Sequence, residues 1–146
     1  MSIDWAKPNS KVSKYFTVKE CLWLPTWNRM ATDADGLSEI IKENLIELCT
    51  QMDLVREALH APLTVHCCYR PEEYNKLVGG ALNSAHKTGQ AIDFDASGNC
   101  DTTRAQILQL DLLSKLRLRM EDLPASSWVH LDTRPPSSEE HRFFKP

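Results

Sequence analysis

Two residues of types that commonly bind zinc stand close together in the segment Ser84–Asp93, which reads S-A-H-K-T-G-Q-A-I-D. His86 offers an imidazole nitrogen and Asp93 a carboxylate oxygen, and both are ordinary ligands for this metal. Gly89 lies between them and permits a turn that would bring the two side chains together. The segment therefore predicts half of a zinc site.

His130 is the best candidate for a third ligand. It lies in the stretch W-V-H-L-D, where strand alternation would point Trp128 and His130 to one face and Val129 and Leu131 to the other. Two histidines and one aspartate leave a coordination position open for water, so we predict one catalytic Zn²⁺. A purely structural zinc is the alternative, and it is weakened by having only three evident ligands.

These motifs resemble those of the zinc D,D-carboxypeptidases, D-Ala-D-Ala dipeptidases and peptidoglycan endopeptidases, which share a fold with the hedgehog signalling domain. The family signature S-x-H-x-x-G-x-A-x-D is met over 84–93, and its terminal W-x-H or V-H-x-D element over 128–132. Tyr69 and Arg70, followed by Asn75 and Val78–Gly80, are similar to the family segment S-G-Y-R-x-x-x-x-N-x-x-V-G-G. The resemblance covers about residues 15 to 132.

The resemblance implies an α+β fold in which a small, mainly antiparallel sheet is backed by helices and carries the metal on its open face. It also implies a zinc metallopeptidase that hydrolyses peptide bonds in the stem peptides of bacterial peptidoglycan. The partner would be peptidoglycan or a D-Ala-containing peptide. The activity would be of the D,D-carboxypeptidase or of the endopeptidase (endolysin) type.

Three residues before or within the histidine segment are predicted to serve the reaction. Arg70 is assigned a catalytic role, because a planar cation beside zinc can polarise the attacked carbonyl or bind a substrate carboxylate. Ser84 and Tyr69 are candidate substrate-binding residues. Ser84 has two further interpretations, a residue that orients the ligand loop and an ordinary turn serine.

One position departs from the family pattern. Members commonly carry a carboxylate three residues before the last zinc histidine, and Ser127 stands there. We therefore expect the general base elsewhere, with Asp132 ranked before Glu121 and Asp122, because Asp132 shares the strand face of His130. Alternatively, Asp132 only orients a histidine. Ser127 also supports a second hypothesis, a weakened or inactive zinc-binding module such as a phage structural or wall-binding domain.

The length of 146 residues and 42% hydrophobic content predict one domain over 15–146, preceded by an irregular, loosely held lead-in over 1–14. A formal charge of −3 argues against a nucleic-acid partner. No apolar run predicts membrane insertion, and the N-terminus lacks the core of a secretory signal. We therefore expect a monomer that is cytoplasmic as synthesised and reaches the cell wall through a phage holin or a virion.

The five cysteines are an odd number without a framework spacing, and we expect them to be mostly reduced. A cysteine zinc site is the alternative. It is disfavoured because the sequence contains no C-x-x-C, and because the adjacent Cys67 and Cys68 would project to opposite faces of a strand.

Helices and strands that would position the site follow from periodicity and capping signals. A capping box predicts a short helix after Thr17, and apolar residues at spacings of three and four predict a long helix over 37–60. Further helices are expected near 72–78 and, as one continuous segment, from 101 to about 120. Strands are expected at 63–68, 91–96 and 127–132, with 143–144 as an edge strand or a cap over the core, and a loop is expected at 26–36.

Overall fold

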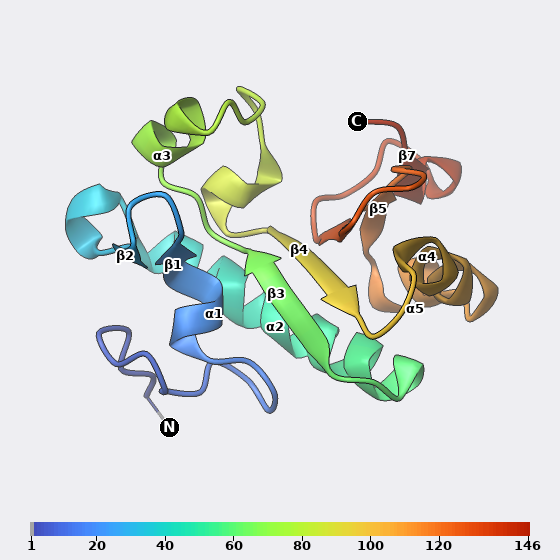
Figure 1. Ribbon diagram of the computed structural model, residues 1–146, viewed down its shortest axis with the longest axis horizontal. Helices are drawn as coiled ribbons and strands as arrows, with labels where there is room; N and C mark the ends of the chain where they lie inside the picture. The colour runs from blue at the N-terminus through green and yellow to red at the C-terminus, as the bar shows by residue number, and fades with distance from the viewer. Residues whose placement is uncertain (1) are drawn as a thin grey trace.

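The computed structural model describes residues 2–146 and has an α+β architecture (Figure 1). The helices are α1 (Val18–Leu22), α2 (Glu39–Leu59), α3 (Glu72–Leu77), α4 (Cys100–Gln109) and α5 (Leu112–Leu116). Short 3-10 helices are η1 (Asp33–Asp35), η2 (Ala85–Thr88) and η3 (Glu139–Arg142). The strands are β1 (Trp23–Leu24), β2 (Arg29–Met30), β3 (Leu63–Cys67), β4 (Ala91–Ala96), β5 (Arg119–Glu121), β6 (Val129–Asp132) and β7 (Phe143–Phe144).

The main sheet has five strands in the order β3-β4-β6-β5-β7. All neighbours in it are antiparallel except β5 and β7, which run parallel. β1 and β2 form a separate antiparallel hairpin. The prediction of a small, mainly antiparallel sheet backed by helices is confirmed.

The two faces of the sheet have different chemistry because β4 and β6 alternate in register. Ile92 is paired with Leu131 and Phe94 with Val129, and all four side chains are fully buried in the core. Asp93 is paired with His130 on the opposite face. One face therefore supplies the core, and the other carries the predicted metal ligands.

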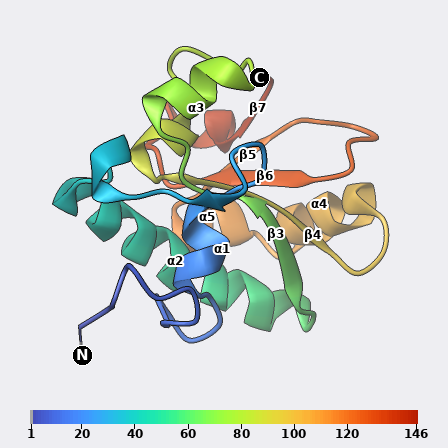
Figure 2. The same cartoon turned by 60° about the vertical axis from the view of Figure 1, so that its left-hand side comes forward.

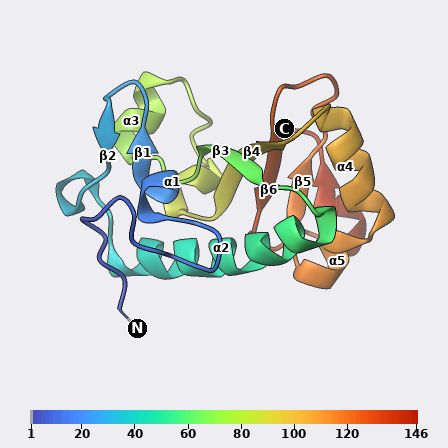
Figure 3. The ribbon, with the colours of Figure 1, turned by 60° about the horizontal axis from the view of Figure 1, so that its bottom comes forward.

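Helix α2 covers the core face. It begins after Ser38, whose hydroxyl accepts a hydrogen bond from the backbone N–H of Ile41 at 3.3 Å. Its buried residues include Leu45, Leu48 and Met52, as the apolar spacing predicts. Figure 3 shows α2 running beneath β3 and β4, and Figure 2 shows α3 on the other side of the sheet. The elements next to the face that carries Asp93 and His130 are therefore α3, η2 and the loops.

The N-terminal region is more tightly packed than expected. The predicted capping box of α1 is present, with Thr17 and Glu20 exchanging hydrogen bonds. Before it, Val12 is buried in the core, and the Asp53 carboxylate of α2 accepts hydrogen bonds from the Ser13 hydroxyl and from two backbone N–H groups. Packing therefore begins before residue 15, because this buried carboxylate holds the end of the lead-in.

The single helix expected from 101 to about 120 is wrong. The chain breaks after α4 at Asp111, which has a φ of 56°, and again after α5 at Arg117, also at 56°. Met120 belongs to β5, where its side chain is fully buried. The prediction was wrong because leucines recur throughout the segment at helical spacing, and this spacing continues across both breaks.

A smaller difference concerns the expected loop at 26–36, whereas the C-terminus agrees with the prediction. The loop contains β2, paired with β1, and η1. Phe143–Phe144 forms the predicted edge strand, paired with β5. Over residues 2–146, every helix is too short or too polar to span a membrane.

Candidate metal centre

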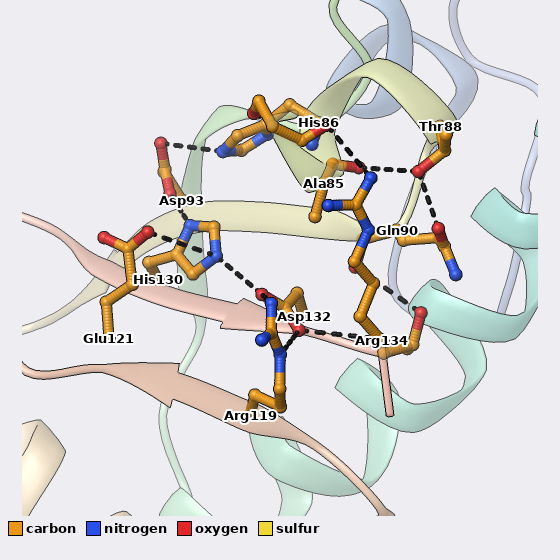
Figure 4. A network of polar contacts seen from close by, with 12 residues as sticks. Ala85, His86, Thr88, Gln90, Asp93, Arg119, Glu121, His130, Asp132 and Arg134 are labelled. Carbon is orange, nitrogen blue, oxygen red and sulfur yellow. Dashed lines mark hydrogen bonds and ion pairs between the residues drawn. The ribbon is translucent and has the colours of Figure 1, made fainter. Parts of the chain in front are cut away.

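Three predicted ligands meet on the open face of the sheet. His86 comes from η2, Asp93 from β4 and His130 from β6, and their ligand atoms all lie within 4.8 Å of one another (Figure 4). Asp93 Oδ2 is 3.1 Å from His86 Nε2, and Asp93 Oδ1 is 2.9 Å from His130 Nδ1. The structure thus brings both histidines to one carboxylate, at the spacing of a group that could hold a metal ion.

The ligand loop has a fixed shape. The Ser84 hydroxyl accepts a hydrogen bond from the His86 N–H at 3.2 Å and begins η2. Gly89 ends η2 in the left-handed region with a φ of 71°, as the predicted turn requires. Asn44 of α2 donates to the Thr88 carbonyl at 2.9 Å, which ties the loop to the scaffold. Ser84 therefore caps the ligand loop, and its part in substrate binding stays a prediction.

Hydrogen bonds on the far side of each ring decide which nitrogen faces Asp93. His86 Nδ1 lies 2.6 Å from the Cys68 carbonyl, and His130 Nε2 lies 3.0 Å from Asp132 Oδ2. Since both acceptors bind an N–H, His86 Nε2 and His130 Nδ1 are left as bases that can coordinate a metal. Among residues 2–146, buried His86 Nε2 makes no well-aligned hydrogen bond, although Asp93 Oδ2 lies only 3.1 Å away. An unsatisfied buried nitrogen beside a carboxylate fits a bound cation.

The charges of the three groups depend on one another. Burial lowers the pKa of His86, but the contacts with Asp93 and Cys67 together outweigh burial and raise that pKa to about 10. Burial raises the pKa of Asp93, but His130 and His86 together hold it below its usual value. A divalent cation would replace the protons that link these groups, because zinc binds the neutral imidazole and the ionised carboxylate.

Asp132, ranked first as general base, has a different geometry. Its side chain is fully buried, and Arg119 binds both carboxylate oxygens, through Nε at 2.7 Å and through Nη2 at 2.9 Å. Burial raises the pKa of Asp132, but His130 and Arg119 together lower it. A carboxylate held in this way is a poor proton acceptor. The arrangement instead suits the alternative role of orienting His130.

Glu121 is a partly exposed carboxylate at the edge of the site. It is at the end of β5, its Oε1 is 3.7 Å from His130 Nε2, and its side chain is 21% exposed. No arginine or lysine among residues 2–146 forms an ion pair with it. Asp122, the other candidate, does not line the cavity described next. Of the three candidates, Glu121 is therefore the one that lines the cavity without being held by an arginine.

A cavity of about 400 Å³ opens above the three ligands, and we call it the main cavity. The Arg70 guanidinium lines it, as predicted, and its Nη2 lies 3.5 Å from the Ser84 hydroxyl. No carboxylate among the described residues pairs with Arg70, and its buried Nε has no hydrogen-bond partner. The remaining lining residues are Ala81, Asn83, Ser84, Ala85, His86, Asp93, Arg119, Glu121, Trp128, His130, Asp132, Arg134, Phe144 and Pro146.

Tyr69 is not placed to bind substrate. It is 2% exposed, it does not line the main cavity, and burial raises its pKa to about 12. Its backbone N–H donates to the Cys21 carbonyl, which fixes the strand end that carries Arg70. The substrate-contact prediction for Tyr69 is therefore replaced by a packing role.

Two arginines of the cavity were not predicted from the sequence. Arg119 holds Asp132, and Arg134 donates to the backbone carbonyls of Asn83 and Ser84 at 2.5 and 3.3 Å. Arg134 follows Asp132 by two positions, so continued strand alternation could have indicated it. Arg119 gave no such signal, because it lay within the segment expected to be helical.

The five thiols are all free in the structure, in agreement with the reduced state expected for most of them. Cys68 is buried and Cys67 is partly exposed, as opposite strand faces would require. Cys67 Sγ lies 3.7 Å from His86 Nδ1, on the side of the ring that faces away from Asp93.

Comparisons with known proteins agree with this geometry. The sequence profile described as Peptidase M15 matches residues 14–132, which is most of the chain. Comparisons with curated proteins and with solved structures gave no match. M15 peptidases are zinc-dependent, and the matched region contains His86, Asp93 and His130. The chain belongs to the Peptidase M15 family.

Proposed function

We propose that this protein is a zinc peptidase that hydrolyses peptide bonds in the stem peptides of bacterial peptidoglycan. The observation that carries the proposal is a carboxylate, Glu121, that lies beside a His–Asp–His set in an open cavity and has no lysine or arginine partner among residues 2–146. A binding module would need the metal ligands, but it would have no use for such an acid at this position.

The residues that would hold zinc are His86 through Nε2, Asp93 through its carboxylate and His130 through Nδ1. When bound, zinc supplies Lewis-acid chemistry, by lowering the pKa of water and polarising the carbonyl of the scissile bond. The Cys68 carbonyl and the Asp132 carboxylate keep the two rings in the required tautomers. The chain thus presents three ligands and leaves the cavity side open for water and substrate.

Glu121 would take the proton from the attacking water and return it to the amine that leaves. It can do so because its carboxylate lies at the cavity wall, is partly exposed and has no cationic partner among residues 2–146. Ser127 stands where family members commonly carry the acid. Glu121 reaches the site from another strand and would supply the missing carboxylate.

Arg70 would stabilise the negative charge that develops on the carbonyl oxygen, or bind a substrate carboxylate. Its guanidinium faces the cavity and pairs with no carboxylate of residues 2–146, so its charge is available to a ligand. Gly80 leaves room for this side chain, because a Cβ there would lie 2.9 Å from Arg70 Nη1. The position of the guanidinium therefore depends on the segment that follows α3.

The substrate assignment rests on the charge of the cavity and on the family. Arg70 and Arg134 both line the main cavity, and neither has a carboxylate partner among residues 2–146. Their charge suits a peptide that carries free carboxylates, as peptidoglycan stems do. Both a D,D-carboxypeptidase and an endopeptidase fit this description.

The test is to incubate the zinc-loaded protein with purified peptidoglycan and identify released peptides by mass spectrometry. We expect defined stem-peptide products from the native chain. Glu121→Gln should lose activity by about 10²–10⁴-fold, the usual contribution of a general base, while it retains zinc. Asp122→Asn is the matched control and should remain active.

Two outcomes would contradict the proposal. Full activity of Glu121→Gln would remove Glu121 from the reaction. The absence of any product from the native, zinc-loaded protein would favour the alternative, a weakened or inactive zinc-binding module.

A further inference from the structure

A second depression lies next to the main cavity, and we call it the side hollow. It has a volume of about 330 Å³ and is lined by His66, Asp93, Ser127 and Trp128. Asp93 and Trp128 also line the main cavity. The two spaces therefore meet at a metal ligand, so that a chain bound across the metal could extend into both.

Trp128 gives the side hollow a fixed apolar wall. Its side chain is 41% exposed, unusual for a residue of this size, although its backbone is firmly held. The Trp128 carbonyl accepts hydrogen bonds from Arg104 Nη1 at 2.8 Å and from the Ser126 hydroxyl at 3.1 Å. Arg104 itself is only 5% exposed. An exposed indole on a rigid backbone is suited to contact a ligand.

The rest of the side hollow offers polar groups. His66 Nε2 lies 2.5 Å from Asp95 Oδ2, which fixes the imidazole of the edge strand β3 beside β4. Ser127 is exposed and adds a small hydroxyl beside the indole. An apolar wall together with a few polar groups is typical of a ligand-binding site.

Glu121 indicates which end of the substrate would enter the side hollow. It lines the main cavity and not the side hollow. The amine that leaves must receive a proton, so it belongs near Glu121, together with the carboxylates that Arg70 and Arg134 attract. The acyl part of the substrate must then extend on the opposite side of Asp93.

We propose that the side hollow formed by His66, Ser127 and Trp128 binds the peptide on the acyl side of the scissile bond. The proposal rests on the proposed peptidase function and deepens it. It means that the enzyme recognises residues on both sides of the bond. Substrates with several residues on the acyl side are therefore preferred to minimal ones.

The test compares two substrates that share the scissile bond and the leaving group. In the short substrate, the residue that supplies the carbonyl of the scissile bond is acetylated at its amino group. In the long substrate, three further stem-peptide residues are attached to that amino group. We expect a higher kcat/KM for the long substrate. Trp128→Ala and His66→Ala should each lower the long-to-short ratio of kcat/KM about three- to tenfold, as the loss of one aromatic or polar contact would do. Ile40→Ala, an exposed apolar residue on α2, is the control and should leave the ratio unchanged.

A binding measurement separates this inference from the proposed function. The NMR signal of the Trp128 indole N–H is followed in the zinc-loaded Glu121→Gln variant. It is assigned as the signal that disappears when Trp128→Phe is added to that variant. We expect this signal to shift with the long peptide and not with the short one. If no substrate is cleaved but the signal shifts, the side hollow stands and the peptidase function fails.

Other results would overturn the inference. An unchanged long-to-short ratio in both the Trp128 and His66 variants would show that the side hollow takes no part in recognition. A shift of the Trp128 signal with a glycan fragment but not with the long peptide would show that the site binds sugar.

Discussion

Asp93 is the residue on which the metal centre depends, because its carboxylate contacts both ligand histidines. Each histidine is held from behind, His86 by a carbonyl and His130 by a carboxylate. The difference matters, because a carboxylate makes the opposite imidazole nitrogen a stronger base than a carbonyl does. The two ligands should therefore respond differently when their supports are removed.

Asp132→Asn should weaken zinc binding about 10–100-fold, which is typical when a group that orients a ligand is removed. The amide keeps the size of the side chain but loses the charge that holds Arg119 and polarises His130. Competition with a chelator measures the affinity. If affinity is unchanged and the acidic limb of the pH–rate profile disappears, Asp132 is the general base.

Arg70→Lys should lower kcat/KM about 10²–10³-fold, the usual effect of removing one donor to the developing oxyanion. Lysine keeps the charge but cannot reproduce the planar fork of the guanidinium. The thermal unfolding temperature should stay near that of the native protein, since Arg70 forms no ion pair within residues 2–146. Arg117→Lys, at an exposed position, is the control. Full activity of Arg70→Lys would refute the role.

At the scale of elements, strands and capped helices were predictable where local signals and packing agreed. The spacing of α2, the capping box of α1 and the alternation of β4 and β6 all use short-range rules that the tertiary structure leaves intact. The prediction for region 101–120 was wrong because the two helices there end at Asp111 and Arg117. Both residues adopt the left-handed conformation, in which glycine is the usual sign of a helix end.

The same limit explains which parts of the site were predicted. His86, Asp93 and His130 belong to motifs with local spacing, so the sequence indicated them. Arg119 and Glu121 reach the site only because β5 pairs with β6, which is a long-range contact that no local pattern encodes. Glu121 was considered as a base but ranked below Asp132, because a loop position gave no reason to prefer it.

The junction between η2 and α2 gives a stability prediction. Gly89 has a φ of 71°, and a Cβ there would lie 3.0 Å from the Ile41 carbonyl oxygen and 3.1 Å from Leu45. Gly89→Ala should cost about 1–2 kcal/mol for the left-handed backbone and about 1–3 kcal/mol more for overpacking.

Gly79→Ala is the matched control, because its φ is 73° but its Cβ would meet open space. It should cost only the backbone part, about 1–2 kcal/mol. Urea denaturation of both variants measures the difference. Equal losses would show that the contact between the ligand loop and α2 contributes nothing.

At the scale of the whole molecule, one sheet separates two tasks. Its inner face packs on α2 and provides stability. Its outer face carries the titratable groups of His86, Asp93 and His130, and a charge on such buried groups requires a counter-ion. In the metal-free protein, protons on the histidines neutralise Asp93. Metal binding and folding stability are therefore linked through the same three side chains.

This linkage predicts opposite pH trends with and without zinc. The ordinary pKa of histidine is 6.5, and contacts with Asp93 and Cys67 outweigh burial and raise that of His86 to about 10. A raised pKa stabilises the metal-free fold below pH 6.5, and this contribution is lost as the pH rises toward 10. Zinc replaces those protons, so the stabilisation by zinc should increase over the same range. With free zinc near 1,000 times its dissociation constant, that stabilisation is about 4 kcal/mol.

Thermal unfolding with and without zinc at about pH 6 and pH 8.5 measures both trends, and the zinc-induced shift of the unfolding temperature should be larger at the higher pH. His66→Ala should behave like the native chain, whereas His86→Ala should lose the shift. A zinc-induced shift that is equal at both pH values would mean that the ion binds elsewhere than between His86, Asp93 and His130.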